Sequence, residues 1–595
     1  MGKMRKIRLE EPEANSLISE LRKTDLIMLT GSTIASWEPT CLFSGRQFID
    51  EMFELLFPRD FLDIDSEEGK ILKKFFERVP FEHLLERFPN RDKLTSVLSE
   101  VFSINVFNPI HEIIAKAIVD SRIKALITTN YDLCLDELFK RSHDPKILKV
   151  ITENDIDKDD INHKKVYFKI HGSADNPSSL VFTLTHERIL PKWKREVLYK
   201  ILNEKVLIII GYSGADFEIC PVVEQIPLKQ IVWNTLTDKF PSYNCKRLLE
   251  QKSGVQLVGD MKKVLSVLFD EKICSSFNPK SDKIDFVKSR LTKCEIMEWR
   301  ASLLNSIGLP SLSLKASERL ISSLSNNTSV AYIRAIRQKA QSLFHLGKYK
   351  NAASLFNKAA LMAKKINNEY LEADLLLDVS SSLRSYGALF RSYHYIKIVL
   401  RTAKKIKDEE KKNRLLGKIF LRKILVLRLF QQVTKRMKLH FLTQWINGKA
   451  QEYLLQSASL SLKTGNWFDF YQTRLVGDSM EIPINTANSD KLYVPPPTKD
   501  AYIQLGYYIP ISIHVREQFK RDRGALTQEE ETILFDFLKT AKSVKNTPEI
   551  WKIAWLGIKR DRRWRRNTEI WKDFFHAFFS CQYTIGMRIF ILFGG

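Results

Sequence analysis

Residues 125–132 read ALITTNYD, a short apolar run that ends abruptly in polar residues. A run that is apolar at consecutive rather than alternate positions is typical of a strand buried on both faces of a parallel sheet. Four more such runs lie in the first half of the chain: LIMLT (26–30), VYFKI (166–170), VLIII (206–210) and QIVW (230–233). Helical patterns such as residues 81–88 and 133–140 separate these five runs. This alternation predicts a doubly wound, Rossmann-like α/β domain with a parallel sheet.

Glycine or polar residues follow each of these five predicted strands. The carboxyl ends of parallel strands meet at one edge of the sheet, where ligands bind in open α/β folds. We therefore expect one site to be lined by Gly31, Ser32, Thr33, Asn130, Asp132, His171, Gly211, Ser213, Asp216 and Asn234.

Each of these residues also has a purely structural interpretation. Asn130 or Asp132 can cap the helix that follows, and His171 can be a hydrogen-bonded turn histidine. Gly31 and Gly211 can serve ordinary strand-to-helix turns. The occurrence of such residues after all five strands favours a functional site.

At these positions the sequence resembles the sirtuin superfamily, and in particular the sirtuin-like NAD-cleaving domains of bacterial anti-phage defence proteins. The matching pieces are TTNYD (128–132), IHGS (170–173) and GYS followed by Asp216, in the family's order. The resemblance covers roughly residues 20–240 and implies a sirtuin-type fold with NAD as the substrate.

The resemblance also implies a role for each matching residue. Asn130 would help to position the attacking water, Asp132 would hold the nicotinamide carboxamide, and His171 would contact the ribose hydroxyls and act as general base. These groups suit the oxocarbenium-like cation that develops when the nicotinamide–ribose bond breaks. The implied dinucleotide-binding residues are Gly31, Ser32 and Thr33 of the first loop, together with Gly211, Ser213, Asp216 and Asn234.

The first loop and the cysteines depart from the family pattern. Thr33 stands where the family has its second glycine and Ala35 where it has a serine, so a side chain at Thr33 would obstruct close approach to the phosphates. The 7 cysteines include no CxxC pair, whereas deacylating sirtuins carry a zinc module built from two such pairs. We therefore expect no metal, and NAD hydrolysis rather than deacylation.

The second half of the chain reads as long amphipathic helices that repeat. Leu343, Gly347 and AKKI (363–366) recur as Leu383, Gly387 and AKKI (403–406), an offset of 40 residues each time. Helical hairpins of this kind stack to cover one another's apolar faces, and their turn resembles that of tetratricopeptide repeats. We predict three regions: a sirtuin-like domain (1–285), a tetratricopeptide-like region (286–480), and a basic, Trp-rich helical region (481–595) that is separate or continuous with the repeats.

The net charge of +24 lies entirely in the second half. Residues 1–300 hold 46 basic and 46 acidic side chains, and the remainder holds 48 and 24. The stretch Lys559–Arg566 has six basic residues in eight, with Trp551, Trp555, Trp564 and Trp571 around it. Basic side chains among aromatic ones suit nucleic acid, but a solvated helix face with its tryptophans in the core is the favoured interpretation. Repeats of this type usually bind protein segments, so a protein trigger is the expected partner.

Scattered cysteines, with neither an apolar signal segment nor a membrane-spanning run, predict a cytoplasmic protein without a membrane anchor. We expect a homo-oligomer. The leading hypothesis is an NAD⁺ hydrolase that acts as the effector of a sensor-effector protein, by resemblance in anti-phage defence. The alternatives are a degenerate NAD- or ADP-ribose-binding scaffold and a nucleic-acid-binding protein that uses the basic half.

Overall fold

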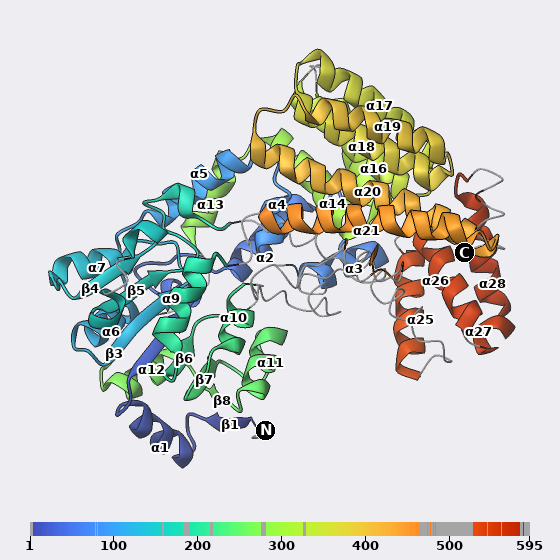
Figure 1. Ribbon diagram of the computed structural model, residues 1–595. Coiled ribbons are helices and arrows are strands. Elements are labelled where there is room, and N and C mark those ends of the chain that lie inside the picture. Colours follow the sequence, from blue (N-terminus) through green and yellow to red (C-terminus); the bar gives the residue numbers. More distant parts are fainter. Residues whose placement is uncertain are drawn as a thin grey trace.

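Figure 1 shows the computed structural model of the chain. The structure describes residues 4–77, 79, 81–156, 160–182, 190–214, 218–274, 276, 281–324, 329–464, 473, 476–477, 480, 482, 528–543, 546–560, 562–583 and 587.

An eight-stranded sheet forms the first part of the chain, and all of its strand pairs are parallel. Its strand order is β1-β8-β7-β6-β2-β3-β5-β4. The five predicted strands are present, and the doubly wound α/β prediction is confirmed. The bounds are β1 (Arg5–Arg8), β2 (Leu26–Thr30), β3 (Ile123–Thr128), β4 (Ile147–Val150), β5 (Lys165–Lys169), β6 (Val206–Ile210), β7 (Gln230–Thr235) and β8 (Val255–Val258).

Both faces of the sheet are buried under helices, which explains the consecutive apolar residues of its strands. In β2, Met28 packs into the core on one face, whereas Ile27 and Leu29 pack into the core on the other. The first face carries α1 (Pro12–Leu21), α6 (Pro109–Val119), α7 (Cys134–Ser142) and α12 (Met261–Phe269). The second carries α9 (Lys192–Leu202), α10 (Ile219–Gln225) and α11 (Tyr243–Gln251).

The chain reverses its direction of winding between β2 and β6. From β2 it adds β3, then the edge strand β4 and then β5 between those two on one side, and it crosses to β6 on the other. The carboxyl ends of β2 and β6 therefore form the switch point of the sheet. Open α/β folds bind their ligands at such a switch point.

A third core joins a helical insertion between β2 and β3 to helices that follow the sheet. Trp299 is fully buried there, and its indole N–H donates to the Leu84 carbonyl at 2.8 Å. Residues on both sides of the predicted domain boundary at residue 285 therefore pack in one core. The boundary itself stays a prediction. The helices involved are α2 (Gly45–Leu56), α3 (Glu67–Phe76), α4 (Phe81–Glu86), α5 (Arg91–Phe102), α13 (Asp282–Arg290), α14 (Lys293–Ile307) and α15 (Pro310–Ser323).

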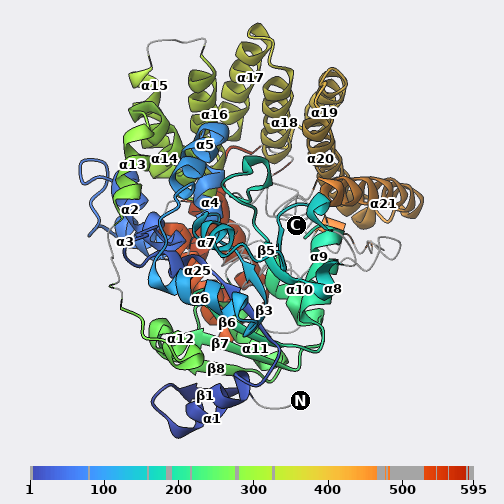
Figure 2. The same ribbon diagram turned by 90° about the vertical axis from the view of Figure 1, so that its left-hand side faces the viewer.

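Long helices come next and lie side by side in a row (Figure 2). The glycines that predicted the 40-residue repeat both adopt positive φ angles at helix ends, +77° for Gly347 and +100° for Gly387. The predicted helical hairpins are thus present. They comprise α16 (Val330–His345), α17 (Tyr349–Lys365), α18 (Glu369–Tyr386), α19 (Leu389–Ala403), α20 (Glu409–Arg436) and α21 (His440–Lys463). None of the helices in the described residues is long and apolar enough to span a membrane.

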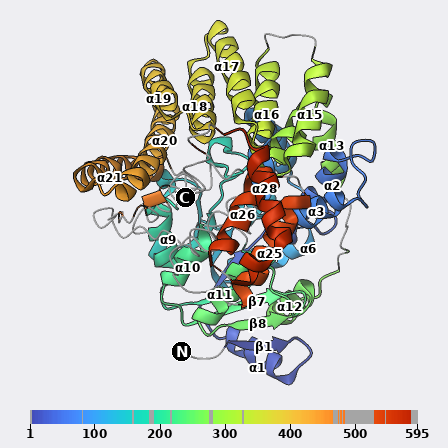
Figure 3. The same cartoon turned by 90° about the vertical axis from the view of Figure 1, so that its right-hand side faces the viewer.

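The last described helices form a bundle beneath this row (Figure 3). They are α25 (Gln528–Ser543), α26 (Thr547–Arg560), α27 (Arg562–Arg566) and α28 (Thr568–Ser580). Trp551 and Trp564 are buried in the core of the bundle, and Trp555 and Trp571 pack against it. The core interpretation of these tryptophans therefore accounts for their pattern. The predicted linker after residue 481 lies largely outside the described residues.

The turn at Gly347 is where this bundle meets the repeats. The backbone N–H of Gln582 donates to the Gly347 carbonyl at 2.8 Å, and the hydroxyls of Tyr349 and Tyr583 lie 3.3 Å apart. A Cβ on Gly347 would lie 2.7 Å from the sulfur of Cys581.

Replacing Gly347 by alanine is expected to loosen this contact. A left-handed backbone costs a non-glycine residue about 1–2 kcal/mol, and overlap with Cys581 adds to it. Amide hydrogen exchange over residues 568–583 should accelerate in Gly347→Ala. The control Gly387→Ala has the same backbone penalty but lies at the other hairpin, so equal acceleration in both variants would contradict the contact.

Candidate functional site

The loops after three strands are tied to one another at the carboxyl edge of the sheet. The Thr129 N–H donates to the Thr30 carbonyl at 3.1 Å, which joins the loops after β3 and β2. The Ala174 N–H donates to the Tyr131 carbonyl at 2.9 Å, which joins the loops after β5 and β3. The predicted residues on these loops are thereby brought to one edge.

The loop after β2 packs directly on the loop after β6. A Cβ on Gly31 would lie 2.6 Å from the Gly211 carbonyl oxygen, so the close approach of the two backbones requires glycine at position 31. The Thr33 N–H donates to that same carbonyl at 3.4 Å. The side chains of Ser32 and Thr33 are exposed, on a 3₁₀ turn (η1, Ser32–Ala35) rather than on an α-helix.

Three predicted dinucleotide-binding residues have different surroundings. Ser213 is exposed, and Asp216 lies outside the described residues. Asn234 lies within β7 rather than after it, because the strand continues to Thr235. Its side-chain amide donates to the carbonyls of Leu257 (3.1 Å) and Gly259 (2.9 Å), so it fastens β7 to β8 and the loop beyond β8.

Asn130 and Asp132 are both buried in the loop between β3 and α7, with 7% and 5% of their surface exposed. One Asp132 oxygen (Oδ1) accepts the Cys134 N–H at 3.1 Å, at the start of α7. Asp132 therefore accepts a backbone N–H at the start of α7, as the capping interpretation expected of Asn130 or Asp132. Asn130 accepts none of the N–H groups of this helix through its side-chain oxygen. The side-chain oxygen of Asn130 has no hydrogen-bond partner among the described residues.

His171 follows β5 and is buried against a carboxylate that the sequence did not single out. Its Nε2 lies 3.1 Å from Oε1 of Glu218, and the two side chains are only 5% and 3% exposed. The ring stacks loosely on Tyr131, with centroids 6.4 Å apart. A carboxylate at this distance from Nε2 can orient the imidazole. The signal in the sequence was the position of Glu218, two residues beyond the GYSGAD motif.

A fully buried lysine supports the same loops from β5. The Lys169 ammonium donates to the Asp132 carbonyl at 2.5 Å and to the Asp136 carboxylate at 2.9 Å. Asp136 also accepts the Tyr167 hydroxyl at 3.1 Å and pairs with Lys149. Lys169 therefore connects the strand that carries His171 to the loop that carries Asn130 and Asp132. A charged residue inside an otherwise apolar strand was the available signal.

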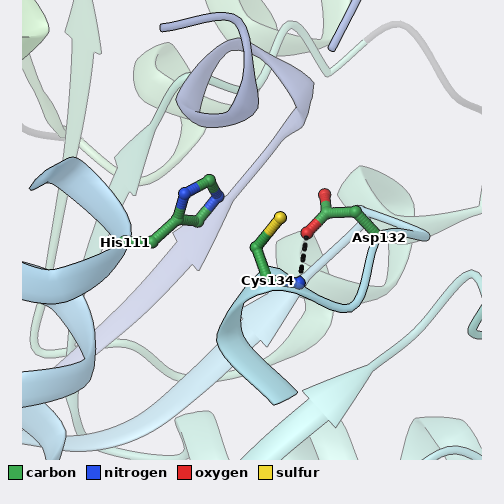
Figure 4. Close-up of side chains that lie close together, drawn as sticks. All are labelled: His111, Asp132 and Cys134. Carbon is green, nitrogen blue, oxygen red and sulfur yellow. Dashed lines mark hydrogen bonds between the residues drawn. The ribbon is translucent and has the colours of Figure 1, made fainter. Parts of the chain in front are cut away.

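Three buried side chains that ligate metals in other proteins lie close together behind this loop: His111, Asp132 and Cys134 (Figure 4). Their nearest ligand atoms are within 4.8 Å of one another. The Cys134 sulfur hydrogen-bonds the Val106 carbonyl at 3.2 Å, and burial raises the pKa of this thiol far above its usual range. A neutral thiol is a weak metal ligand, since the thiolate is the form that binds. The expected absence of a metal stays a prediction.

Several buried polar atoms near this edge have no hydrogen-bond partner among the described residues. They belong to the last residue of β2, to the residue that follows η1, to the first turn of α6 and to the loop after β3. Buried polar atoms are nearly always hydrogen-bonded in folded proteins, so these four atoms are candidates for hydrogen bonds to a ligand or to water. These atoms are the Thr30 Oγ1, Ser36 Oγ, His111 Nε2 and Asn130 Oδ1.

Comparison with known proteins identifies the segment that carries most of these residues. Residues 124–229 match the family model of the SIR2-like domain. No curated protein matches the chain significantly. Among solved structures, the chain matches a signal transduction ATPase with numerous domains (STAND) protein with a tetratricopeptide repeat sensor from Pyrococcus horikoshii. The two are 12% identical, with 98% of this chain and 95% of that chain covered, but the TM-score of 0.18 is too low to support an argument.

The matched segment begins in β3 and ends just before β7, so it contains Asn130, Asp132, Lys169, His171 and Glu218. The sheet supplies the Rossmann-like architecture around it, and the helical row lies beyond it in the chain. The chain therefore contains a SIR2-like domain joined to a mostly helical C-terminal half.

Proposed function

We propose that the SIR2-like domain is an NAD⁺ glycohydrolase, which cleaves the nicotinamide–ribose bond and releases nicotinamide and ADP-ribose. The observation that carries this proposal is the pairing of a buried His171–Glu218 dyad with the unpaired side-chain oxygen of Asn130 at the carboxyl edge. An acid–base group and an unpaired polar group, both shielded from water, suit a hydrolytic reaction on a bound ligand.

Each of the four side chains of the proposed site has one role in the proposed reaction. As the nicotinamide leaves, positive charge develops on the ribose, and a shielded base and an oriented water can capture the resulting cation. His171 would accept a proton from the water or a ribose hydroxyl, with Glu218 stabilising the imidazolium. Asn130 would orient the water through its unpaired oxygen, and Asp132 would hold the carboxamide of the departing nicotinamide.

We further propose that the helical half controls this activity. Its helical hairpins suit recognition of a protein trigger, and its excess of 48 basic over 24 acidic residues suits an acidic partner. An enzyme that consumes NAD must be restrained until it is needed, which agrees with a sensor-effector role in anti-phage defence. A cytoplasmic homo-oligomer fits this role.

The test is nicotinamide release by the full-length protein, alone and in lysates of phage-infected cells. Asn130→Ala and His171→Ala should each abolish release, because they remove the water-orienting group and the base. His163→Ala is the matched control, since His163 is an exposed histidine of the same domain. The proposal fails if wild type and both site variants are equally inactive in every condition.

One observation favours a second candidate function, an NAD- or ADP-ribose-binding scaffold without turnover. The Thr33 amide is bonded to the Gly211 carbonyl, so the first loop offers one amide fewer to a phosphate. This alternative predicts that ADP-ribose raises the melting temperature while no nicotinamide is released. Release by wild type would reject it.

A further inference from the structure

The positive charge of the chain is concentrated on the last three helices of the row. Residues 389–451, which form α19, α20 and the first half of α21, hold 17 lysines and arginines against three aspartates and glutamates. Their net charge of +14 is more than half of the +24 of the whole chain. The SIR2-like segment lies elsewhere in the sequence, so the proposed cleavage of NAD does not account for this charge.

Two of the three acidic residues of this segment are paired within their own helix. Asp408 is the N-cap of α20 and forms an ion pair with Lys411 at 3.1 Å, and Glu409 pairs with Lys412 at 2.8 Å. On α19, by contrast, the exposed cations have no carboxylate partner in the part of the chain that the structure describes. These cations are Arg391, Lys397, Arg401, Lys404 and Lys405, the last two directly after the helix end.

Three of these cations lie along one side of α19. Residues three or four positions apart lie on the same side of a helix. This spacing is followed by five exposed residues, which are Phe390, His394, Lys397, Arg401 and Lys404. One repeat of 40 residues earlier, the corresponding positions of α17 are Lys350, Ser354, Asn357, Leu361 and Lys364. The equivalent side of α17 therefore has fewer cations and no aromatic ring.

Aromatic side chains are exposed next to these cations. Phe390 is 84% exposed at the start of α19, and Phe441 (79%) and Trp445 (55%) lie one turn apart at the start of α21. The ring of Phe390 lies 6.2 Å from that of Phe430, which is close to the end of α20. Because α21 starts at His440, soon after α20 ends, and the two helices lie side by side (Figure 1), the exposed rings share one end of this helical group.

Rings and ammonium groups also contact one another on these helices. The Lys397 ammonium lies 5.2 Å from the centre of the Tyr393 ring, which is partly exposed. The Lys423 ammonium lies 5.3 Å from the ring of Phe420 and 4.4 Å from that of Tyr453. Cations at such distances are attracted to the faces of aromatic rings. Cations and rings are therefore interleaved on all three helices.

This combination indicates a ligand with both negative charges and flat apolar groups. A solvated helix face accounts for the unpaired cations but not for large rings that are exposed together. Single-stranded nucleic acid supplies both partners, because its phosphates pair with lysine and arginine while its unpaired bases stack on aromatic rings. In a duplex the base faces are covered by neighbouring bases. An acidic peptide offers carboxylates without a regular series of flat groups.

We propose that the α19–α21 surface, defined as the cationic side of α19 with the exposed rings of Phe390, Phe441 and Trp445, binds single-stranded nucleic acid. The phosphates follow the cations of α19, and the bases stack on the three rings. This inference goes beyond the proposed function, because it requires neither NAD nor the residues at the carboxyl edge of the sheet. The basic stretch Lys559–Arg566 differs from this surface, since the tryptophans around it belong to the core of the bundle or pack against it.

The test measures the binding of a fluorescein-labelled deoxythymidine strand of about 20 nucleotides to the full-length protein, by anisotropy at several KCl concentrations. The logarithm of the association constant should fall linearly with the logarithm of the salt concentration, by about 0.7 for each phosphate contacted. Phe441→Ala and Trp445→Ala should each weaken binding about tenfold and leave this slope unchanged, because they remove a ring but no charge. Both side chains are exposed, so these variants should fold as wild type does.

A charge variant and its matched control test the cationic side of α19. Lys404→Gln with Lys405→Gln should weaken binding and reduce the salt slope by about 1.4, since two phosphate contacts are lost. The control is Lys364→Gln with Lys365→Gln, because these exposed lysines occupy the same place in the AKKI sequence one repeat earlier. It should retain the affinity and slope of wild type. Equal effects of the two double variants would show that total charge, and not this surface, governs binding.

Competition experiments decide the class of ligand. A DNA duplex of the same length should compete at least tenfold less well than the unlabelled single strand at high salt, where stacking outweighs the phosphate contacts, and poly-glutamate of similar charge should not compete. The proposal is overturned if the strand does not bind at low salt, or if both ring variants bind it as wild type does. If poly-glutamate competes as well as the single strand, the surface binds an acidic protein segment instead.

Discussion

Replacing Glu218 by glutamine should reduce the turnover number for nicotinamide release by about 10²–10⁴-fold. The carboxylate lies 3.1 Å from Nε2 of His171, and both side chains are almost fully buried. Glutamine keeps the size of the side chain but removes the negative charge that, in the proposed reaction, would stabilise the imidazolium of His171. The effect should appear in kcat rather than KM, because in the proposed site Glu218 acts through His171, whose Nε2 it approaches.

A second acid on the same helix provides the control. Glu224 pairs with Arg247 at 2.7 Å, and its side chain is 18% exposed. Glu224→Gln therefore removes a charge from α10 without touching His171, and it should retain most of the wild-type turnover. Equal turnover in wild type and Glu218→Gln would show that the charge of Glu218 does not contribute to turnover. Glu218 would then have only a structural role.

The sheet could be predicted from sequence where its strands are central and apolar. Strands β2 and β6 were located to the residue, because both faces of these strands are buried and nearly every position is apolar. The sequence signal was weaker for β1, β4 and β8, which have four residues each, with one polar residue in β4 and in β8 and three in β1. In β8 that residue is Gln256, which is fully buried and donates to the Thr235 hydroxyl at 3.0 Å. The sequence does not show this partner, because Gln256 and Thr235 lie on different strands that only the fold brings together.

Some residues of the candidate site could also be predicted from the sequence, and others could not. Asn130, Asp132 and His171 could be singled out because they come soon after buried strands, where the chain leaves the sheet at a shared edge. Glu218 and His111 were missed, because they reach the site from helix starts rather than from the end of a predicted strand. His111 lies near the start of α6, before β3 in the chain, and its position depends on a capping box. Helix periodicity alone marks it as a core residue.

Lys169 is the residue whose replacement should most affect both stability and the site. It is fully buried and holds the Asp136 carboxylate at 2.9 Å and the Asp132 carbonyl at 2.5 Å. Lys169→Met keeps most of the apolar stem but leaves Asp136 with less compensation for its buried charge. Removing one partner of a buried ion pair destabilises a protein by about 3–5 kcal/mol. Hydrogen exchange in β3 and β5 should accelerate accordingly.

A lysine at the other end of β5 provides the matched control. Lys165 pairs with Asp144 at 2.9 Å and donates to the Val119 carbonyl at 2.6 Å, but both members of this pair retain some exposure, 13% and 14%. Because water can partly replace the lost partner, Lys165→Met should accelerate exchange much less than Lys169→Met. If the two substitutions accelerated exchange to a similar degree, the complete burial of Lys169 would not be what makes its ion pair important for stability.

A double variant separates the stabilising role of Lys169 from its effect on the site. In Lys169→Met with Asp136→Asn, the buried carboxylate is neutralised along with its partner, and the asparagine oxygen can still accept the Tyr167 hydroxyl. Much of the lost stability should return, since neutral replacement of both partners avoids the desolvation penalty. Nicotinamide release should stay low, because the Asp132 carbonyl still lacks the ammonium that holds its loop. Recovery of activity together with stability would mean that Lys169 contributes only to folding.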